Sequence, residues 1–175
     1  PGRVRGLRPA VRRAPAGAGG EPDCLGAGGF ELPLSRVDSV ASATGLILND
    51  LANASPYPSV IVVSNMTQVL TRVTVSVTGF RHDNPADVKM LLVGPNGQNV
   101  ELMSAAGAGS SVTDVNLEFD DEAAASLPQF SRLTTGVYRP TSYEPGVSYS
   151  DPAPATPYGA SLGAFAGIVP NGAWS

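Results

Sequence analysis

Apolar and polar side chains alternate most regularly between residues 69 and 80. Valines occupy most of the positions on one side of this run, and Arg, Thr and Ser lie between them. A period of two in a run rich in β-branched residues predicts a half-buried antiparallel strand and excludes a helix. The apolar side of the predicted strand is formed by Val69, Val73, Val75 and Val77.

Shorter apolar runs indicate further strands. Residues 59–63 follow a proline-containing turn, and residues 114–119 again alternate apolar with polar side chains. Residues 88–93 and 98–103 are separated by the sequence Gly-Pro-Asn-Gly at 94–97. Proline presets φ in such a turn and glycine tolerates a positive φ, so these two runs predict a hairpin.

Signals for helices are sparse. Residues 120–127 begin with three acidic side chains, which suit the positive end of a helix dipole, and Pro128 follows them. This segment therefore predicts one helical turn. From Gly136 onward, Pro and Gly recur between tyrosines, which indicates long loops with short strands. Short strands separated by turn signals predict an all-β fold, built as a β-sandwich.

Composition divides the chain into three segments. Residues 1–29 are rich in Gly, Ala, Pro and Arg and have no hydrophobic period, which predicts a disordered N-terminal tail. Residues 30–56 are moderately apolar and predict edge strands or a linker. Residues 57–175 hold the regular strand pattern and predict the β-sandwich domain.

Length and charge limit the classes of function. A chain of 175 residues with 42% hydrophobic residues fits one domain with a core. Its apolar runs are all shorter than the roughly 18 residues that a membrane-spanning helix needs. Five of the 11 basic residues lie in the first thirteen positions, so six basic residues face all 15 acidic residues in the rest. This acidic body argues against nucleic-acid binding and favours a cation as ligand.

Two groups of carboxylate and amide side chains point to a calcium site. One group lies in the turn after the predicted strand 69–80, and the other lies on and after strand 114–119. Calcium prefers about six to eight oxygen ligands of this kind on loops, and groups at strand ends can converge. Solvated acidic turns, or caps of backbone amides, explain the same residues, so both interpretations stand. The candidate ligands are Asp83, Asn84, Asp87, Asp114, Asp120 and Asp121.

Signatures of catalysis are weak. Ser161 lies in the sequence GASLG, which has the spacing of a nucleophile elbow. That mechanism needs a strand before the serine, a helix after it and a histidine later in the chain. The single histidine, His82, comes earlier and has no second histidine or cysteine beside it for a zinc site. The sequence predicts no catalytic residue, and His82 is interpreted as a hydrogen-bonding loop residue.

Five segments, taken in their order, resemble the P/Homo B domain of subtilisin-like proprotein convertases. In that family a histidine after a long strand precedes an Asp-hydrophobic step, a hydrophobic strand and a Pro-x-Gly turn, and a later stretch ends in a Gly-x-Trp strand. The resemblance is closest to the bacterial versions on secreted and surface proteins, and it covers about residues 57–175. The segments are 58–62 (PSVIV), 73–77 (VTVSV), 82–97 (HDNPADVKMLLVGPNG), 162–167 (LGAFAG) and 171–175 (NGAWS).

The resemblance implies a jelly-roll β-sandwich that is secreted or on the cell surface and often binds calcium. It implies a module that is not itself catalytic and that stabilises or docks a protease or a larger surface protein. Residues 1–56 hold no subtilisin-like catalytic domain, so the expected protein partner lies outside this chain. The family pattern continues past the Gly-x-Trp strand, and we therefore expect a sandwich that is incomplete at its C-terminus and marginally stable alone.

Two other functions remain open. The first alternative is a carbohydrate-binding jelly roll, in which exposed tyrosines stack on sugar rings, although buried tyrosines with bonded hydroxyls explain the same residues. A hydrolase that uses Ser161 is a more distant alternative. The tyrosines considered for a sugar-stacking face are Tyr138, Tyr143, Tyr149 and Tyr158.

Overall fold

The computed structural model describes residues 2–4, 6–13, 37–42, 45–49 and 52–175. These residues form thirteen β-strands and two short 3-10 helices, η1 (Pro85–Asp87) and η2 (Leu162–Phe165). The prediction of an all-β fold is confirmed. None of the helices in the described ranges has the length and apolar character needed to cross a bilayer.

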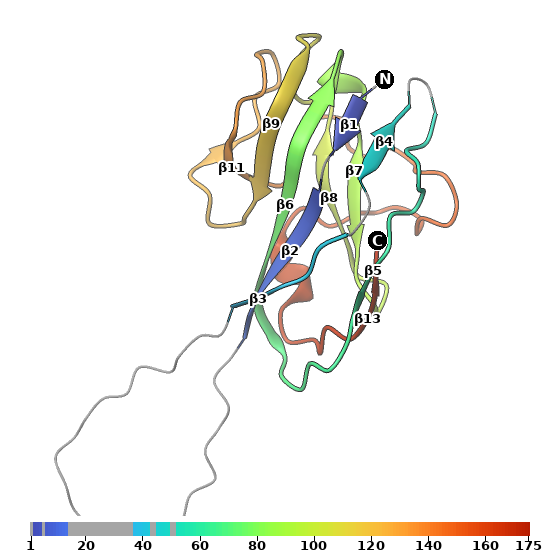
Figure 1. The fold of residues 1–175 in the computed structure, drawn as a ribbon, viewed down its shortest axis with the longest axis vertical. Helices are drawn as coiled ribbons and strands as arrows, with labels where there is room; N and C mark the ends of the chain where they lie inside the picture. The colour runs from blue at the N-terminus through green and yellow to red at the C-terminus, as the bar shows by residue number, and fades with distance from the viewer. Residues whose placement is uncertain (1, 5, 14–36, 43–44, 50–51) are drawn as a thin grey trace, which may run out of the picture.

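One sheet is organised around the long strand β6 (Leu70–His82), which pairs with β9 (Val112–Phe119) on one side. On the other side of β6, two strands share the edge: β1 pairs near Arg81, and β2 pairs from Thr78 to Leu70. Figure 1 shows β9, β6 and β2 side by side. The remaining strands extend this sheet outward from β9, β1 and β2. Besides β6 and β9, the strands of this sheet are β1 Gly2–Val4, β2 Gly6–Arg13, β3 Val37–Ser39, β4 Leu46–Leu48, β10 Ala125–Ser126 and β11 Gly136–Arg139.

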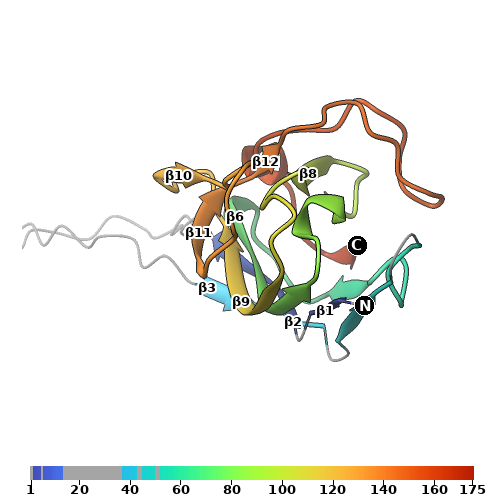
Figure 2. The ribbon, with the colours of Figure 1, turned by 90° about the horizontal axis from the view of Figure 1, so that it is seen from above.

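The second layer consists of two short sheets that join side by side. β7 (Met90–Val93) and β8 (Asn99–Ser104) form a hairpin, with β12 (Thr141–Ser142) beside β8. β13 (Gly172–Trp174) pairs with β5 (Ile61–Val63). Val93 and Ser175 exchange two backbone hydrogen bonds of 2.7 and 3.0 Å, so the order across this layer is β12-β8-β7-β13-β5. Figure 2 shows β8 and β12 opposite β6 and β9.

The core lies between the two layers. Val73, Val75 and Val77 of β6 are buried, as their alternation predicts, and they face apolar side chains from β7 and β8. The predicted hairpin is also confirmed: β7 and β8 are antiparallel, and Gly97 takes a positive φ of 84° in the turn. At Gly94, the rings of Phe165 and Trp174 pack where a β-carbon would otherwise lie.

Two bulges change which side chains of β6 and β9 face the core. Between Val77 and Phe80 the β6 strand has one more residue than β9, and Gly79 takes φ 64° there. Between the next two pairs, Phe80–Val115 and His82–Val112, the β9 strand has one more residue than β6. Asp114 lies in this second bulge and takes φ 57°. A bulge shifts the alternation by one residue. Phe80 and His82 therefore point inward, although the alternation of the valines predicts the opposite.

Part of the segment 1–29, for which the sequence predicts a disordered tail, contributes strands to the sheet. Gly2–Val4 and Gly6–Arg13 are strands that pair with β6. Backbone amides and carbonyls can pair with an adjacent strand whatever the side-chain pattern, and the long β6 offers an edge opposite β9. The sheet therefore includes residues that precede residue 57. Residues 14–29, with Cys24, lie outside the described residues.

Residues 30–56 contain two short strands in the part that is described, β3 and β4, so the prediction of edge strands is confirmed there. The helical turn predicted over 120–127 is wrong. Residues 120–123 make a single turn closed by Ala123 N–H donating to the Asp120 carbonyl, and Ala125–Ser126 form β10. The acidic residues that suggested a helix start have other partners, described below.

Candidate functional site

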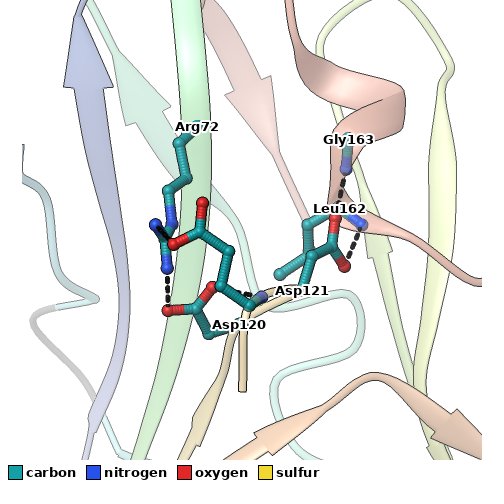
Figure 3. A network of polar contacts seen from close by, with 6 residues as sticks. Arg72, Asp120, Asp121, Leu162 and Gly163 are labelled. Atoms are coloured by element: carbon teal, nitrogen blue, oxygen red, sulfur yellow. Dashed lines mark hydrogen bonds and ion pairs between the residues drawn. The ribbon is translucent and has the colours of Figure 1, made fainter. Parts of the chain in front are cut away.

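Asp120 and Asp121 are adjacent in sequence but bind different elements (Figure 3). Arg72 of β6 donates from one guanidinium nitrogen to Asp120 and from the other to Glu122. The hydrogen bond to Asp120 is the main cause that raises the pKa of Arg72. Asp120 Oδ1 also accepts from the Glu122 backbone N–H at 3.0 Å. This carboxylate is therefore held by a cation and an amide.

Asp121 caps the helix η2. Its carboxylate accepts hydrogen bonds from the Leu162 N–H at 2.9 Å, the Gly163 N–H at 2.7 Å and the Ser161 hydroxyl at 2.7 Å. The first amides of a helix lack intrahelical partners, and a carboxylate is well suited to satisfy them. Asp121 thus fixes the segment from Ser161 to η2 against the end of β9, a structural role that the sequence analysis left open as one of two interpretations.

The other predicted calcium ligands lie elsewhere. Asn84 and Asp87 bind each other in the turn after β6, where Asn84 Nδ2 donates to Asp87 Oδ2 at 2.6 Å. Asp83 is exposed in the same turn, and Asp114 is exposed at the bulge of β9. Because β6 and β9 are antiparallel, this turn lies at the opposite end of the sheet from Asp120.

Asp120 and Asp121 therefore do not converge with the turn after β6, whereas Asp114 lies at the same end of the sheet as that turn. Among the described residues, no group of three or more His, Cys, Asp or Glu side chains is arranged to hold a metal ion. The register of β6 with β9 places Asp120 and Asp121 apart from the other four candidates. Calcium binding by the protein stays a prediction.

Ser161 and His82 lie far apart. Ser161 donates to Asp121, next to the Leu70 end of β6, where the Gly167 N–H bonds the Leu70 carbonyl. His82 is the last residue of β6. Ten residues of strand between Arg72 and His82 span about 33 Å at about 3.3 Å per residue. The serine and the imidazole are thus too far apart to act as nucleophile and base.

The four candidate tyrosines do not share a surface. Tyr138 and Tyr143 donate their hydroxyls to the carbonyls of Thr134 and Leu127, in the region around β11 and β12. Tyr149 and Tyr158 pair edge to face, with ring centroids 5.3 Å apart and planes at 79°.

The hydroxyl of Tyr149 donates to Glu101 at 2.9 Å, and Tyr57 donates to the Ser150 carbonyl at 2.7 Å. Burial, followed by the nearby Glu101 carboxylate, raises the pKa of Tyr149 well above its ordinary value. Tyr149 therefore forms a partly buried polar pair with Glu101 that ties the long loop before Gly159 to β8.

A cleft of about 440 Å³ opens between the two layers. One wall comes from β4 and the segment 52–59, and the other comes from β7 and the loop 148–153. Side chains of β6 and β8 that face the core lie at its base. Most of the lining is apolar, which is typical of small-molecule sites of this size. Its apolar side chains include Leu46, Leu48, Pro56, Val77, Val88, Met90, Leu92 and Leu102.

His82 is a polar side chain in this apolar lining. Only 7% of the residue is exposed, and its Nδ1 accepts a hydrogen bond from the Asn84 backbone N–H at 3.1 Å. An imidazole whose Nδ1 accepts carries its proton on Nε2. Within the described part of the chain, the structure shows no acceptor for this Nε2–H. The interpretation of His82 as a loop residue is therefore wrong, because the bulge at Gly79 turns it from the end of β6 into the core.

The edge of the second layer at β5 is a further feature. Ser175 exchanges its backbone bonds with Val93 of β7, so the next residue of β13, Trp174, directs its backbone groups toward β5. Alternation along an antiparallel pair makes Ile61 and Val63 the bonded residues of β5. The amide and carbonyl of Val62 consequently point away from β13, and nothing in the described ranges pairs with them. The side chains of Val60 and Val62 are 49% and 69% exposed.

The sequence carried one signal for the cleft that its analysis missed. Gly79 interrupts a run of β-branched residues, and an isolated glycine in a strand pattern indicates a bulge. A bulge at that position predicts that His82 is buried. Comparison of the chain with protein-family models, curated proteins and solved structures gave no match. The resemblance to the P/Homo B domain therefore stays a prediction that rests on the residues quoted for it.

Proposed function

We propose that this chain is a non-catalytic β-sandwich module that docks a partner protein at the free edge of β5. The partner contributes an extended segment that adds a strand next to β5, with apolar side chains at alternate positions. In line with the family resemblance, the module acts outside the cell and stabilises or docks a protease or a larger surface protein.

The free edge of β5 is the observation that carries this proposal. An exposed strand edge offers open donors and acceptors, and proteins ordinarily protect such edges with charges, prolines or covering segments. β5 has none of these within Ile61–Val63, and its open groups are the amide and carbonyl of Val62. Main-chain hydrogen bonds supply affinity in strand addition, and the alternate side chains supply specificity.

The side chains of β5 favour an apolar partner segment. Val60, which directly precedes β5, and Val62 alternate with the buried Ile61 and Val63, so the two exposed valines lie on the same face. Both are exposed valines. A partner strand in register beside β5 would cover them with its own alternate side chains, and each such cross-strand pair contributes about 0.2–1 kcal/mol.

The alternative of a carbohydrate-binding module has less support. Sugar binding needs an aromatic face open to stacking, and Tyr149 and Tyr158 present an edge-to-face pair instead. Tyr149 is also engaged with Glu101. Binding of soluble glycans that is lost in Tyr158→Ala but retained in a β5 variant would favour this alternative over docking.

The proposal is tested with the full 175-residue chain and a displayed pool of random peptides. We expect the selected peptides to alternate β-branched or aromatic residues with polar ones, and to bind the chain with slower exchange of the Val62 amide proton. Val62→Lys places a charge on the docking face and should abolish binding of the best peptide. Val69→Lys is the matched control, because Val69 is also an exposed valine but lies outside β5.

Three results would overturn the proposal. They are selected peptides without an alternating pattern, equal binding by the two lysine variants, and unchanged amide exchange in β5 when peptide is bound.

A further inference from the structure

The cleft between the layers carries an inference that goes beyond docking at β5. We propose that it binds an uncharged, largely apolar small molecule whose carbonyl oxygen accepts a hydrogen bond from His82 Nε2–H. Ketones, esters and amides on an apolar body are the chemical class. The site is separate from the proposed docking edge, since Val60 and Val62 do not line the cleft.

The state of His82 supplies the first step of the argument. The side chain is almost fully buried, and its one intramolecular hydrogen bond in the described structure uses Nδ1 as acceptor. His82 is also one of the few polar side chains that line the cleft. An acceptor placed in the cleft beside Nε2 would form a hydrogen bond with this donor on binding. A small number of polar groups in an apolar lining is typical of small-molecule sites.

The fold holds the imidazole in place. The bulge at Gly79 turns the end of β6 inward, and the Gly79 N–H is itself fixed by Asn116 Oδ1 at 2.8 Å. On the other side of the ring, Asn84 N–H fixes Nδ1. Both the direction of the side chain and the position of its proton are therefore set before a ligand arrives, which lowers the entropic cost of binding.

The apolar lining of the cleft favours a ligand that is largely apolar. Side chains of Val77, Val88, Met90 and Leu102 surround the base of the cleft. Apolar ligand surface that leaves water here favours binding. A volume of about 440 Å³ lies within the range that holds one small organic molecule.

The charges near the cleft decide between a neutral and an anionic acceptor. Two charged side chains line it, Asp87 and Lys89. The ammonium of Lys89 lies 3.0 Å from the carboxylate of Glu144, so its charge is already compensated. Asp87 is left as the negative group that an anionic ligand would meet. A neutral carbonyl avoids this repulsion, whereas a carboxylate does not.

Three naphthalene dyes of the same shape test the inference by fluorescence titration of the full chain. They are 6-propionyl-2-dimethylaminonaphthalene, the same ring without the carbonyl group, and the corresponding 6-carboxylate. We expect saturable binding of the ketone to one site, with a blue shift of its emission. Loss of the carbonyl should weaken binding about tenfold, the equivalent of one hydrogen bond of about 1.4 kcal/mol. The carboxylate should bind more weakly than the ketone.

Variants of residues in and outside the cleft test whether the ketone binds there. Met90→Trp fills it and should abolish binding, while Val137→Trp adds the same ring to β11, outside the lining residues, and should leave binding unchanged. His82→Phe removes the donor and should weaken the ketone about tenfold without affecting the dye that lacks a carbonyl. His82→Gln keeps an N–H donor and should restore much of the affinity. Val62→Lys should have no effect, which separates this site from the docking edge.

The single histidine also gives a direct signal. In the free protein, the imidazole ¹⁵N spectrum should show the proton on Nε2, and the ketone should shift this resonance. The inference is overturned if the ketone does not bind saturably, if Met90→Trp and Val137→Trp behave alike, or if the dye without a carbonyl binds as tightly as the ketone. An imidazole signal unchanged by saturating ketone would also overturn it.

Discussion

Replacement of Gly159 by alanine tests how the long loop before η2 is held to the second layer. Gly159 bridges to β8 through two backbone hydrogen bonds: its N–H donates to the Asn99 carbonyl at 3.2 Å, and its carbonyl accepts from the Glu101 N–H at 2.9 Å. A β-carbon at Gly159 would lie 2.7 Å from the Asn99 carbonyl oxygen. That oxygen belongs to the backbone of a paired strand and cannot rotate away.

The magnitude follows from these contacts. Ordinary carbon–oxygen contacts lie at about 3.3–3.6 Å, so the two segments must separate by roughly half an ångström. The bond to Asn99 is already long and would be lost, and the bond from Glu101 would weaken. Each bond is worth about 0.5–1.5 kcal/mol, and an orphaned buried amide costs about 1–3 kcal/mol. We expect Gly159→Ala to lower the free energy of unfolding by about 2–4 kcal/mol.

Gly109→Ala is the matched control. The nearest atom to a β-carbon there is Asn84 Oδ1 at 3.7 Å, an ordinary contact, and the residue is exposed. Alanine also restricts the unfolded chain, which stabilises the folded state by about 0.4–1 kcal/mol where the backbone geometry permits. The two glycines are therefore expected to respond with opposite signs.

Urea unfolding, followed by the fluorescence of the single tryptophan, measures both variants. Trp174 is buried beside Phe165 in the core, so its emission reports loss of the packed state. Thermal unfolding should agree, at about 2–4 °C for each kcal/mol in a chain of this size. The reasoning is refuted if Gly159→Ala is as stable as Gly109→Ala within about 0.5 kcal/mol, the usual scatter for harmless surface changes.

Three further predictions concern the cap, the buried tyrosine and the bulge. Asp121→Ala removes three hydrogen bonds from the start of η2 and should cost about 1–2 kcal/mol in urea unfolding; unchanged exchange of the Gly163 amide would contradict the cap. Tyr149 keeps its proton in the folded state to a higher pH than in the unfolded chain, so stability should fall as pH rises above about 10, by at most about 1.4 kcal/mol per pH unit from this group. Tyr149→Phe should flatten this alkaline decline, and an equal slope in both proteins would be inconsistent with the raised pKa. Gly79→Ala forces a β-carbon into a left-handed conformation and should cost about 1–2 kcal/mol, whereas the same stability as the parent would argue against the bulge.

Part of the candidate site could be predicted from sequence and part could not. The carboxylates at Asp120 and Asp121 were found as chemically active groups, because acidic residues after a strand stand out locally. Their partners were not found: Arg72 and the amides at 162 and 163 lie about 40–50 residues away along the chain. Which donor reaches which carboxylate depends on the register between strands, and no local pattern contains that register.

The N-terminal strands show a second limit. Residues 2–4 and 6–13 lack the alternation that predicts a strand, yet they form β1 and β2, which pair with β6 through the backbone. An edge strand can gain its hydrogen bonds from a longer strand without burying a regular apolar face. Composition alone therefore predicted disorder where the sheet supplies order.

The amino-acid sequence by itself determined the strand class, the long β6 strand, the β7–β8 hairpin and the inward valines. Side-chain alternation and turn chemistry act within a few residues, so these features need no knowledge of the rest of the molecule. Tertiary structure alone decided the burial of His82, the separation of the carboxylate groups and the free edge of β5. Each of these depends on the pairing of distant segments. The two compensating bulges turn His82 inward, and the antiparallel register of β6 with β9 separates the carboxylates. The backbone pairing of Ser175 with Val93 determines which edge of β5 stays open.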